Sequence, residues 1–562
     1  MDAGVHAGVN VPLPGVVYPD PERLRAYVAA GELPQQSLAD ALIGSFSKNA
    51  ERTALLTCGR AVTYAELDDI TNRAAYAFLQ LGMRPLDRVL FQSANSLDVV
   101  FAFIGCLKAQ LIPVCTLPAH REREISYLGA FTDAHLHIVQ GDDPKFDLEA
   151  FALKMKAAIP TMDHIVSLRG NARYGISQFD ALVASVDSST AAAAIASIAH
   201  DPYQVAVFQL SGGSTGTPKV ITRFSNDYLL NARLTIDILG YRPDDVVFNP
   251  MPMLHNACMI CSWLPSLLSG ATFEIADDLT PAAWAKLFRL RKPTFIGLIR
   301  ALLPRLDSAL EEFPEMLDDV RAFWCPDAAR NVRERYGIRS HAMFGMTEGM
   351  NMYVRSDDPQ EVADWCVGTP MSRFDEVRLV APGSDREVGN DEVGELECRG
   401  PYTLRGYYNA PERNREAFTP DGFYKTGDLM VRREIEGKLQ YAFAGRFKDI
   451  VNRGMEKISC EELENALCTH EAVLDVAVVG MTDEKLGERV CAYLVVRPNA
   501  TAPTVAELGA FLHRYGLAKF KWPERIEIID ALPLTKAGKL DKSALRLHID
   551  AKRQEELEGA AR

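Results

Sequence analysis

The sequence lacks an excess of positive charge. Its 562 residues include 61 Lys and Arg against 75 Asp and Glu, which gives a formal net charge of −14 at pH 7. Binding to nucleic acid or to an anionic membrane surface depends on clustered positive charge. The composition therefore argues against both classes of partner.

Long apolar runs and a cysteine framework are also missing. The longest charge-free stretch of note, residues 246–273, contains three prolines and several polar groups, so it does not suit a membrane-spanning helix. Residues 1–14 have neither the basic nor the apolar region of a secretory signal. The eleven cysteines are odd in number and irregularly spaced, which is typical of free thiols in a reducing compartment. We therefore expect a cytoplasmic protein without a membrane anchor.

What the chain does have is an ordinary globular composition, with 48% hydrophobic and 24% charged residues. Helical and strand patterns alternate through the first two thirds, for example a helix at 68–81, a strand at 88–91 and a helix at 96–109. This alternation predicts α/β layers with much parallel pairing. After about residue 445 the pattern changes to that of a small α+β domain.

The strongest local signal is a loop rich in glycine and hydroxyl residues, 211–219, which follows the apolar strand pattern 205–210. Glycines let backbone N–H groups approach an anion closely, and the terminal lysine adds positive charge. The spacing fails the P-loop rule because Pro218 precedes Lys219. A flexible linker is the alternative, but the preceding strand favours a nucleotide phosphate loop. Its candidate residues are Ser211, Gly212, Gly213, Ser214, Thr215, Gly216 and Lys219.

This loop and five further motifs, in the same order, resemble the adenylate-forming superfamily of acyl-CoA synthetases, peptide-synthetase adenylation domains and firefly-type luciferases. The further motifs are residues 107–114, 344–349, 424–428, 445–449 and 532–539. The resemblance spans about residues 62–544. It implies an N-terminal extension (1–40) packed on a large α/β adenylation domain (41–445), a hinge (446–450) and a small mobile α+β lid domain (451–562).

The resemblance also implies roles for individual residues. Thr347 offers a hydroxyl to the α-phosphate of ATP, and Glu348 offers a hard oxygen to Mg²⁺. Lys539 stabilises charge between the attacking carboxylate and the α-phosphate. The predicted catalytic set also includes His255. The nucleotide is further bound by Asp428 and Arg446, and Lys448 matches the hinge residue. Taken singly, most of these residues would be ordinary turn or helix-start features.

The segment around Asn256 is similar to the aryl-acid branch of that superfamily, the free-standing ligases for 2,3-dihydroxybenzoate or salicylate. In that branch the matching Asn bonds an ortho substituent of the acid, whereas amino-acid-activating relatives have an Asp there. Cys261 is a weaker hydrogen-bond partner than the Ser of 2,3-dihydroxybenzoate enzymes. This difference disfavours recognition of a 3-hydroxyl group on the acid. A helix-start amide is the alternative for Asn256, and a zinc site formed by His255, Cys258 and Cys261 lacks a clear fourth ligand.

Two departures from that branch change the expected acid. Trp324 and Cys325 stand where relatives have small residues, and Asn351 puts an amide where they have an apolar side chain. With Gly345, these residues complete the predicted substrate-binding set. We therefore expect a small hydroxy- or amino-substituted aromatic acid.

The expected reaction is ATP-dependent formation of an acyl-adenylate, followed by transfer to the phosphopantetheine thiol of a carrier protein. An aryl- or acyl-CoA ligase is the first alternative, because both reactions share the first step. Adenylation with a non-thiol acceptor and a luciferase-like oxygenase or a nucleotide-binding regulator stay open as well.

Overall fold

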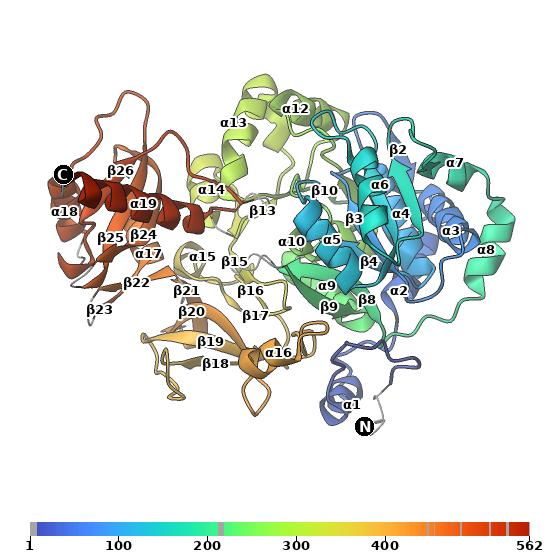
Figure 1. Ribbon diagram of the computed structural model, residues 1–562, viewed down its shortest axis with the longest axis horizontal. Coiled ribbons are helices and arrows are strands. Elements are labelled where there is room, and N and C mark those ends of the chain that lie inside the picture. Colours follow the sequence, from blue (N-terminus) through green and yellow to red (C-terminus); the bar gives the residue numbers. More distant parts are fainter. Residues whose placement is uncertain are drawn as a thin grey trace. The chain divides into compact units, whose positions relative to one another are not determined.

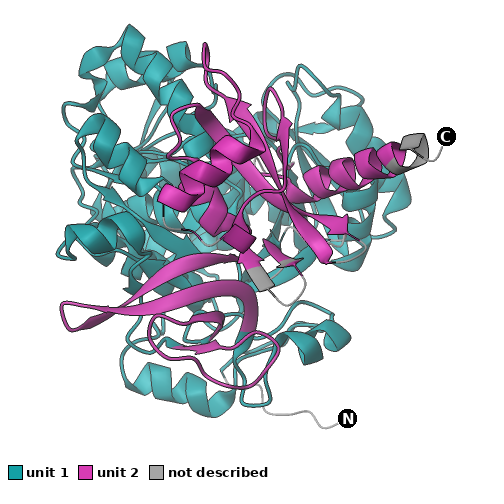
Figure 2. Ribbon diagram, turned by 90° about the vertical axis from the view of Figure 1, so that its left-hand side faces the viewer, with its two compact units in different colours: residues 1–376, 398–424 teal, residues 377–397, 425–562 magenta. Residues whose placement is uncertain are grey.

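The computed structural model describes residues 8–211, 218–326, 328–446, 449–453, 456–483, 486–515, 517, 519–535 and 539–560. The chain divides into two compact units, one formed by residues 1–376 and 398–424 and the other by residues 377–397 and 425–562 (Figure 2). The domain boundaries expected from the sequence, including a hinge at 446–450, stay predictions. No helix in the described part of the chain combines the length and the apolar character that crossing a membrane requires.

The first unit contains two seven-stranded sheets with helices around them, and Figure 1 labels some of these elements. One sheet has the order β7-β6-β5-β3-β4-β8-β9 and is parallel except for the pair β8 and β9. Its strands are β3 (Arg88–Gln92), β4 (Ile112–Cys115), β5 (Ala134–Gln140), β6 (His164–Leu168), β7 (Ser177–Gln178), β8 (Val205–Ser211) and β9 (Lys219–Phe224). The helices nearest to it in the sequence are α4 (Leu97–Lys108), α5 (Glu122–Phe131), α6 (Leu148–Ala158), α7 (Phe179–Ala184), α8 (Ser188–Ala196) and α9 (Ser225–Leu239).

The other seven-stranded sheet has the order β14-β13-β12-β10-β11-β1-β2, parallel except for β1 and β2. Its strands are β1 (Thr53–Leu56), β2 (Ala61–Thr63), β10 (Val246–Phe248), β11 (Thr272–Glu274), β12 (Phe295–Gly297), β13 (Ala322–Trp324) and β14 (Ser340–His341). Its connections include α10 (Asn256–Cys258), the π-helix η1 (Met259–Trp263), α11 (Leu264–Ser269), α12 (Pro281–Leu290), η2 (Arg300–Leu302), α13 (Leu303–Glu312), η3 (Pro314–Leu317) and α14 (Ala329–Tyr336). The largely parallel pairing of both sheets confirms the expected α/β class.

The rest of the first unit is built from shorter elements. They are α1 (Pro21–Ala29), α2 (Leu38–Lys48), α3 (Tyr64–Gln80), α15 (Gln360–Trp365), α16 (Pro411–Ala417) and a small sheet of β15 (Met343–Gly345), β16 (Asn351–Tyr353) and β17 (Thr369–Pro370). Helix α3 begins four residues before the predicted start at Asp68. The reason is a capping box in which the Thr63 hydroxyl accepts from the Glu66 backbone N–H and the Glu66 carboxylate accepts from the Thr63 N–H.

The second unit has the predicted α+β character. A four-stranded sheet, part of which belongs to the first unit, consists of β18 (Glu376–Val380), β19 (Val393–Arg399), β20 (Tyr424–Ile435) and β21 (Lys438–Arg446). A five-stranded sheet consists of β22 (Ile450–Arg453), β23 (Glu456–Ser459), β24 (Val473–Asp483), β25 (Gly487–Val496) and β26 (Arg525–Ile528). The remaining elements are α17 (Cys460–Leu467), α18 (Val505–Arg514), η5 (Lys519–Lys521) and α19 (Lys542–Ala560).

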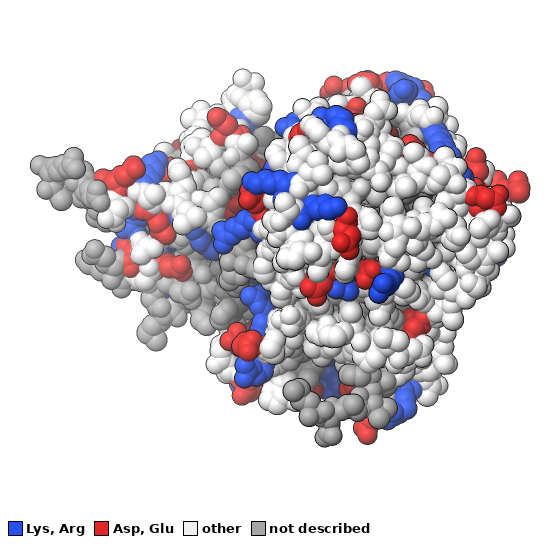
Figure 3. All heavy atoms as spheres, turned by 45° about the vertical axis from the view of Figure 1, so that its right-hand side comes forward, with Lys and Arg blue, Asp and Glu red and all other residues white. Residues whose placement is uncertain are grey.

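The surface reflects the charge composition. On the face drawn in Figure 3, basic and acidic side chains alternate in small groups between neutral areas. No large basic field of the kind that binds nucleic acid is visible on that face.

One buried carboxyl group makes the stability of the first unit depend on pH. Glu274 at the end of β11 is fully buried, and neither of its side-chain oxygens has a hydrogen-bond partner in the described residues. Burial raises the pKa of the Glu274 carboxyl well above its ordinary range, against the opposing charge of Arg291. Since the unfolded chain ionises near a pKa of about 4.3, unfolding releases a proton above that pH. This group therefore lowers the free energy of unfolding as the pH rises, by up to about 1.4 kcal/mol per pH unit until the folded pKa is reached.

The variant Glu274→Gln keeps the shape of the side chain and removes its titration. We expect the urea midpoint of the variant, relative to that of the unmodified protein, to rise steadily between pH 5 and pH 8. The exposed Glu311 provides the control, because Glu311→Gln should give the same relative midpoint at every pH. A pH-independent difference for Glu274→Gln would show that Glu274 is ionised in the folded protein.

Candidate functional site

Strands β8 and β9 hold the two ends of the predicted phosphate loop against each other. Ser211 is paired directly with Lys219 in the antiparallel register of the two strands. The loop residues Gly212, Gly213, Ser214, Thr215 and Gly216 lie outside the described residues. The Lys219 Nζ lies 3.4 Å from the Tyr407 hydroxyl and 4.7 Å from the centre of its ring. A positive charge is thus fixed at the end of the loop, where the sequence predicted it to meet a phosphate.

The carboxylate of Glu348 contacts the hydroxyl of the same tyrosine. Glu348 is only 6% exposed, and its Oε1 accepts a hydrogen bond of 2.9 Å from the Tyr407 hydroxyl. The hydroxyls of Tyr407 and Tyr424 are 2.8 Å apart. Burial, and then the negative charge of Glu348, raise the pKa of Tyr407, so this phenol stays a protonated donor. Tyr407 therefore contacts both Lys219 and Glu348, the predicted phosphate and magnesium ligands.

The chemistry of Glu348 fits a magnesium ion. Mg²⁺ prefers hard oxygen ligands and is usually held by one or two carboxylates together with substrate phosphates and water. Among the described residues, no three His, Cys, Asp or Glu side chains are grouped as metal ligands. A magnesium ion on Glu348 would therefore complete its coordination with phosphate oxygens and water.

The loop that carries Thr347 and Glu348 is clamped by its neighbours. The Arg223 Nη1 donates to the Thr347 carbonyl at 3.0 Å, and the Leu404 backbone N–H donates to the Glu348 carbonyl at 2.6 Å. Gly349 has a φ of +121°, and a Cβ there would lie 2.0 Å from the Tyr402 carbonyl oxygen. Only glycine fits this position, because it needs both the unusual φ and the close approach of two backbones.

The predicted acid-binding residues Asn256 and Cys261 lie on adjoining helical segments. His255, half-buried, is the N-cap of α10, and its Nδ1 accepts from the Ala257 N–H at 3.2 Å. Asn256 begins α10 and is 4% exposed, and its Oδ1 accepts a 2.5 Å hydrogen bond from the Tyr228 hydroxyl. Cys261 lies in the π-helix η1, a rare local geometry often found at functional sites.

Cys261 is buried and neutral. Its Sγ accepts from the Tyr353 hydroxyl at 3.0 Å, and burial raises the pKa of the thiol to about 12. The thiol is therefore protonated and is not a reactive thiolate.

Asn351 on β16 is also buried. Its Nδ2 lies 3.5 Å from the Oδ1 of Asn231, and a Cβ at the exposed Gly345 would lie 2.4 Å from the Asn351 Oδ1. Gly345 and Asn351 are also direct partners in the β15–β16 register. The Nδ2 of Asn231 has no hydrogen-bond partner in the described residues.

Trp324 and Cys325 are both buried but pack into different core clusters. Trp324 shares a cluster with Cys261 and Tyr353, and its Nε1 has no hydrogen-bond partner among the described residues. Cys325 belongs instead to the cluster that contains Phe323. The structure therefore groups Trp324, but not Cys325, with the other predicted acid-binding residues.

The predicted ribose-binding pair lies in the second unit. Asp428 and Arg446 are direct partners in the β20–β21 register, and the Arg446 Nε donates to the Asp428 Oδ1 at 3.0 Å. Asp428 is buried, whereas 62% of the Arg446 side chain is exposed. Lys539 is exposed in a turn in which its backbone N–H donates to the Thr535 Oγ1 at 3.2 Å. Lys448 lies outside the described residues.

Three phenols complete the first unit's part of the site, and sequence reasoning did not assign a role to any of them. They are Tyr228, Tyr353 and Tyr407, which hydrogen-bond to Asn256, Cys261 and Glu348. With 18 tyrosines in the chain, residue type alone cannot single these out. The partners of Tyr407 and Tyr353 lie 59 and 92 positions away in the chain.

Comparisons with known proteins cover nearly the whole chain. A model described as AMP-binding enzyme matches residues 45–408, and one described as AMP-binding enzyme C-terminal domain matches residues 462–539. The chain is 36% identical over 530 residues to pyochelin synthase PchD of Pseudomonas aeruginosa, which covers 93% of this chain and 94% of that protein. It is 35% identical over 543 residues to the 2,3-dihydroxybenzoate-AMP ligase of Bacillus subtilis, covering 95% and 97%. The solved apo structure of Mycobacterium smegmatis MbtA matches with a TM-score of 0.71 and 32% identity, covering 95% of this chain and 98% of that one.

The contact between Tyr407 and Glu348 predicts a specific defect. The variant Tyr407→Phe removes the hydroxyl that fixes the carboxylate, so we expect Mg²⁺-dependent binding of ATP to weaken by about five- to tenfold, as for loss of one hydrogen bond to a charged group. Calorimetric titration of ATP at several Mg²⁺ concentrations measures this effect.

The neighbouring Tyr408 is also buried, and its ring packs 4.8 Å from that of Phe208. The variant Tyr408→Phe is therefore a matched control that should bind ATP normally. Equal affinities of the Tyr407→Phe and unmodified proteins at every Mg²⁺ concentration would count against a role of Tyr407 in orienting Glu348.

Proposed function

The chain belongs to the AMP-binding enzyme family, and from this premise we propose that it activates a small aromatic carboxylic acid with ATP. In the first step a carboxylate oxygen of the acid forms a bond to the α-phosphorus. The bond from that phosphorus to the pyrophosphate oxygen breaks, giving an acyl-adenylate and pyrophosphate.

The observation that carries this proposal is the amide of Asn256. Its carbonyl oxygen is engaged by Tyr228, so its Nδ2 donors are what it can offer to a ligand. A neutral amide pairs poorly with the ammonium group of an α-amino acid. Asn256, Cys261 and Asn351 are all uncharged, which suits a neutral ring and disfavours amino acids as substrates.

For the first step we assign Lys539 to the charge that develops between the carboxylate and the α-phosphate, and Thr347 to the α-phosphate itself. Lys219 and the loop that precedes it contact the terminal phosphates, and Asp428 accepts hydrogen bonds from the ribose hydroxyls. Glu348 holds the magnesium ion, oriented by Tyr407. When bound, that ion neutralises part of the negative charge of the phosphates.

For the second step we propose that a phosphopantetheine thiol attacks the acyl carbonyl and that AMP leaves. A carrier protein is the acceptor that we favour, because one relative, 35% identical over 538 residues, is the salicyl-AMP ligase / salicyl-S-ArCP synthetase of Mycobacterium tuberculosis. Free CoA uses the same chemistry and is the alternative acceptor. We place the reaction in the cytoplasm, since eleven cysteines without framework spacing are typical of a reducing compartment.

Two unpartnered donors in the first unit refine the acid. The Asn231 Nδ2 and the Trp324 Nε1 are buried without hydrogen-bond partners in the described residues. Buried donors without a partner are costly, and a ligand that supplies acceptors offsets this cost. We therefore propose an acid whose ring carries an additional acceptor, such as a hydroxyl, an amino group in its neutral form or a ring nitrogen.

Acid-dependent exchange of labelled pyrophosphate into ATP tests the proposal. The panel consists of salicylate, dihydroxybenzoates, aminobenzoates, pyridine carboxylates, aliphatic acids and α-amino acids. We expect exchange with one or a few of the substituted aromatic acids. Exchange only with aliphatic or α-amino acids would refute the proposed substrate class.

Lys539→Ala gives the matching test of the catalytic assignment. We expect exchange to fall by at least a hundredfold with little change in ATP affinity, since the lysine acts on charge that develops in the transition state. Lys438→Ala, which removes an exposed lysine from the same unit, is the control and should exchange normally. Unimpaired exchange in the Lys539→Ala variant would remove this lysine from the mechanism.

Cys261 predicts how the enzyme discriminates between acids. The variant Cys261→Ser replaces a weak hydrogen-bond partner with a hydroxyl. We expect the kcat/KM ratio of 2,3-dihydroxybenzoate to salicylate to rise by about five- to tenfold, roughly one hydrogen bond. Cys258→Ser, three residues earlier and equally buried, controls for the polarity change itself and should leave the ratio unchanged. An unchanged ratio in Cys261→Ser would show that this position does not contact the 3-substituent.

A further inference from the structure

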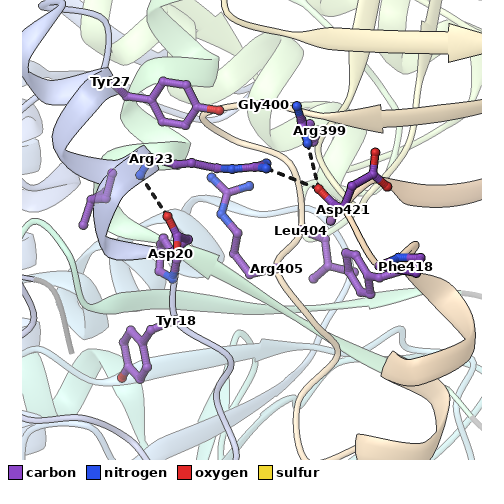
Figure 4. Close-up of a pocket in the computed structure, with 14 residues that line it drawn as sticks. Tyr18, Asp20, Arg23, Tyr27, Arg399, Gly400, Leu404, Arg405, Phe418 and Asp421 are labelled. Carbon is purple, nitrogen blue, oxygen red and sulfur yellow. Dashed lines mark hydrogen bonds between the residues drawn. The ribbon is translucent and has the colours of Figure 1, made fainter. Parts of the chain in front are cut away.

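A pocket separate from the candidate site lies in the first unit, between the N-terminal helix α1 and the segment 399–422. Its volume is about 390 Å³, and Figure 4 shows the side chains that line it. None of its lining residues has a part in the proposed reaction. Three arginines reach into it, Arg23 from α1 and both Arg399 and Arg405 from the segment 399–422.

Two of these guanidinium groups have spare donor capacity. The Arg405 Nη2 donates to the Pro401 carbonyl at 2.9 Å and its Nη1 to the Thr403 carbonyl, while the Arg23 Nη2 donates to the Asp421 carbonyl at 3.2 Å. A guanidinium has five N–H donors. Within the described residues neither Arg23 nor Arg405 forms an ion pair, whereas Arg399 is paired with Glu376 at 2.6 Å.

The carboxylates in the pocket wall are engaged elsewhere. The Asp20 Oδ1 caps α1 by accepting from the backbone N–H groups of Glu22 and Arg23, at 3.1 and 3.0 Å. The Asp421 Oδ1 accepts from the Thr419 hydroxyl at 2.6 Å. Burial lowers the pKa of the Arg405 guanidinium, and the positive charge of Arg23 adds to this effect. An anion between the two guanidinium groups would be favoured by both.

The remaining wall is apolar and largely aromatic. It includes the rings of Tyr18, Tyr27 and Phe418 and the side chains of Leu24 and Leu404. The Tyr18 hydroxyl donates to Gln204 and accepts from the Leu13 N–H, so it is used outside the pocket. Such walls suit the flat apolar body of an organic anion better than a small inorganic ion.

We infer that this pocket is a second binding site, for a small aromatic carboxylate. The carboxylate group of the ligand pairs with Arg23 and Arg405, and arginine is well suited to hold both carboxylate oxygens. The ring of the ligand packs against Tyr18, Tyr27 and Phe418.

This site is connected to the candidate active site through one short segment. Leu404 lines the pocket, and its backbone N–H donates to the Glu348 carbonyl. Three residues further on, Tyr407 holds the Glu348 carboxylate. A ligand that shifts residues 404–407 therefore acts on the predicted magnesium ligand, which makes the pocket a place where an aromatic acid can regulate the enzyme.

Calorimetric titration of the full chain with 2-naphthoate tests the inference, using Arg23→Gln and Arg25→Gln as matched variants. Both remove one positive charge from α1, but Arg25 is exposed and does not line the pocket. We expect the affinity for 2-naphthoate to fall at least tenfold in Arg23→Gln and to stay unchanged in Arg25→Gln. Arg405→Lys keeps the positive charge but loses the planar guanidinium that can bond both carboxylate oxygens, so it should weaken binding as well.

Parallel titrations separate this site from the acid-activating one. Asn256→Ala removes a predicted ligand of the active site and should leave the Arg23-dependent binding event intact. Equal affinities in Arg23→Gln and Arg25→Gln would overturn the inference. So would Arg23-dependent binding of inorganic phosphate without binding of 2-naphthoate. A failure of the proposed function appears separately, as absence of pyrophosphate exchange with every aromatic acid.

Discussion

The geometry of the first unit depends on one buried ion pair. Arg223, on β9, is completely buried, and its Nη2 lies 3.1 Å from the carboxylate of Asp227, on α9. The same guanidinium donates to the carbonyls of Thr347 and Tyr402. A single side chain thus ties the strand after the phosphate loop to the Thr347 loop and to the segment that carries Tyr407. Removing one member of a buried pair leaves an uncompensated charge and costs about 3–5 kcal/mol.

This arrangement separates a charged from an uncharged region within one unit. The charged region consists of Lys219 and Glu348, which both contact the Tyr407 hydroxyl. The predicted nucleotide and its metal ion need fixed charges there. The predicted acid-binding side chains Asn256, Cys261 and Asn351 are neutral, and two of them, Asn256 and Cys261, accept hydrogen bonds from phenols. Phenols whose pKa values are raised by burial remain reliable donors, as Tyr353 does toward Cys261. The predicted acid-binding region therefore offers a substrate hydrogen-bonding groups without a negative charge that would repel its carboxylate.

The sequence predicted the elements well and the contacts among them poorly. The apolar run 205–210 became β8, because its signal is local. The roles of Glu348 and Asn256 come from the resemblance of their segments to the superfamily, and they stay predictions. Tyr407 was missed because its role depends on a partner 59 positions away. The role of Arg223 was missed because an arginine is normally predicted to be exposed, and only its ion pair with Asp227 explains its burial. The separation of Trp324 from Cys325 could have been predicted, however, because consecutive residues along a strand point to opposite faces and Cys325 directly follows Trp324 at the end of β13.

The segment 399–407 connects these observations. Arg405 within it contributes spare guanidinium donors to the pocket, and Tyr407 at its end donates a hydrogen bond to the predicted magnesium ligand, Glu348. The backbone of Tyr402 and Thr403 leaves no space beside Gly349, and the Leu404 N–H donates to the Glu348 carbonyl, so the segment cannot move without moving the Thr347 loop. A closely packed connection of this kind transmits a displacement instead of absorbing it. Binding of an anion beside Arg405 and binding of magnesium at Glu348 are therefore expected to be energetically coupled, and the coupling must be equal in both directions.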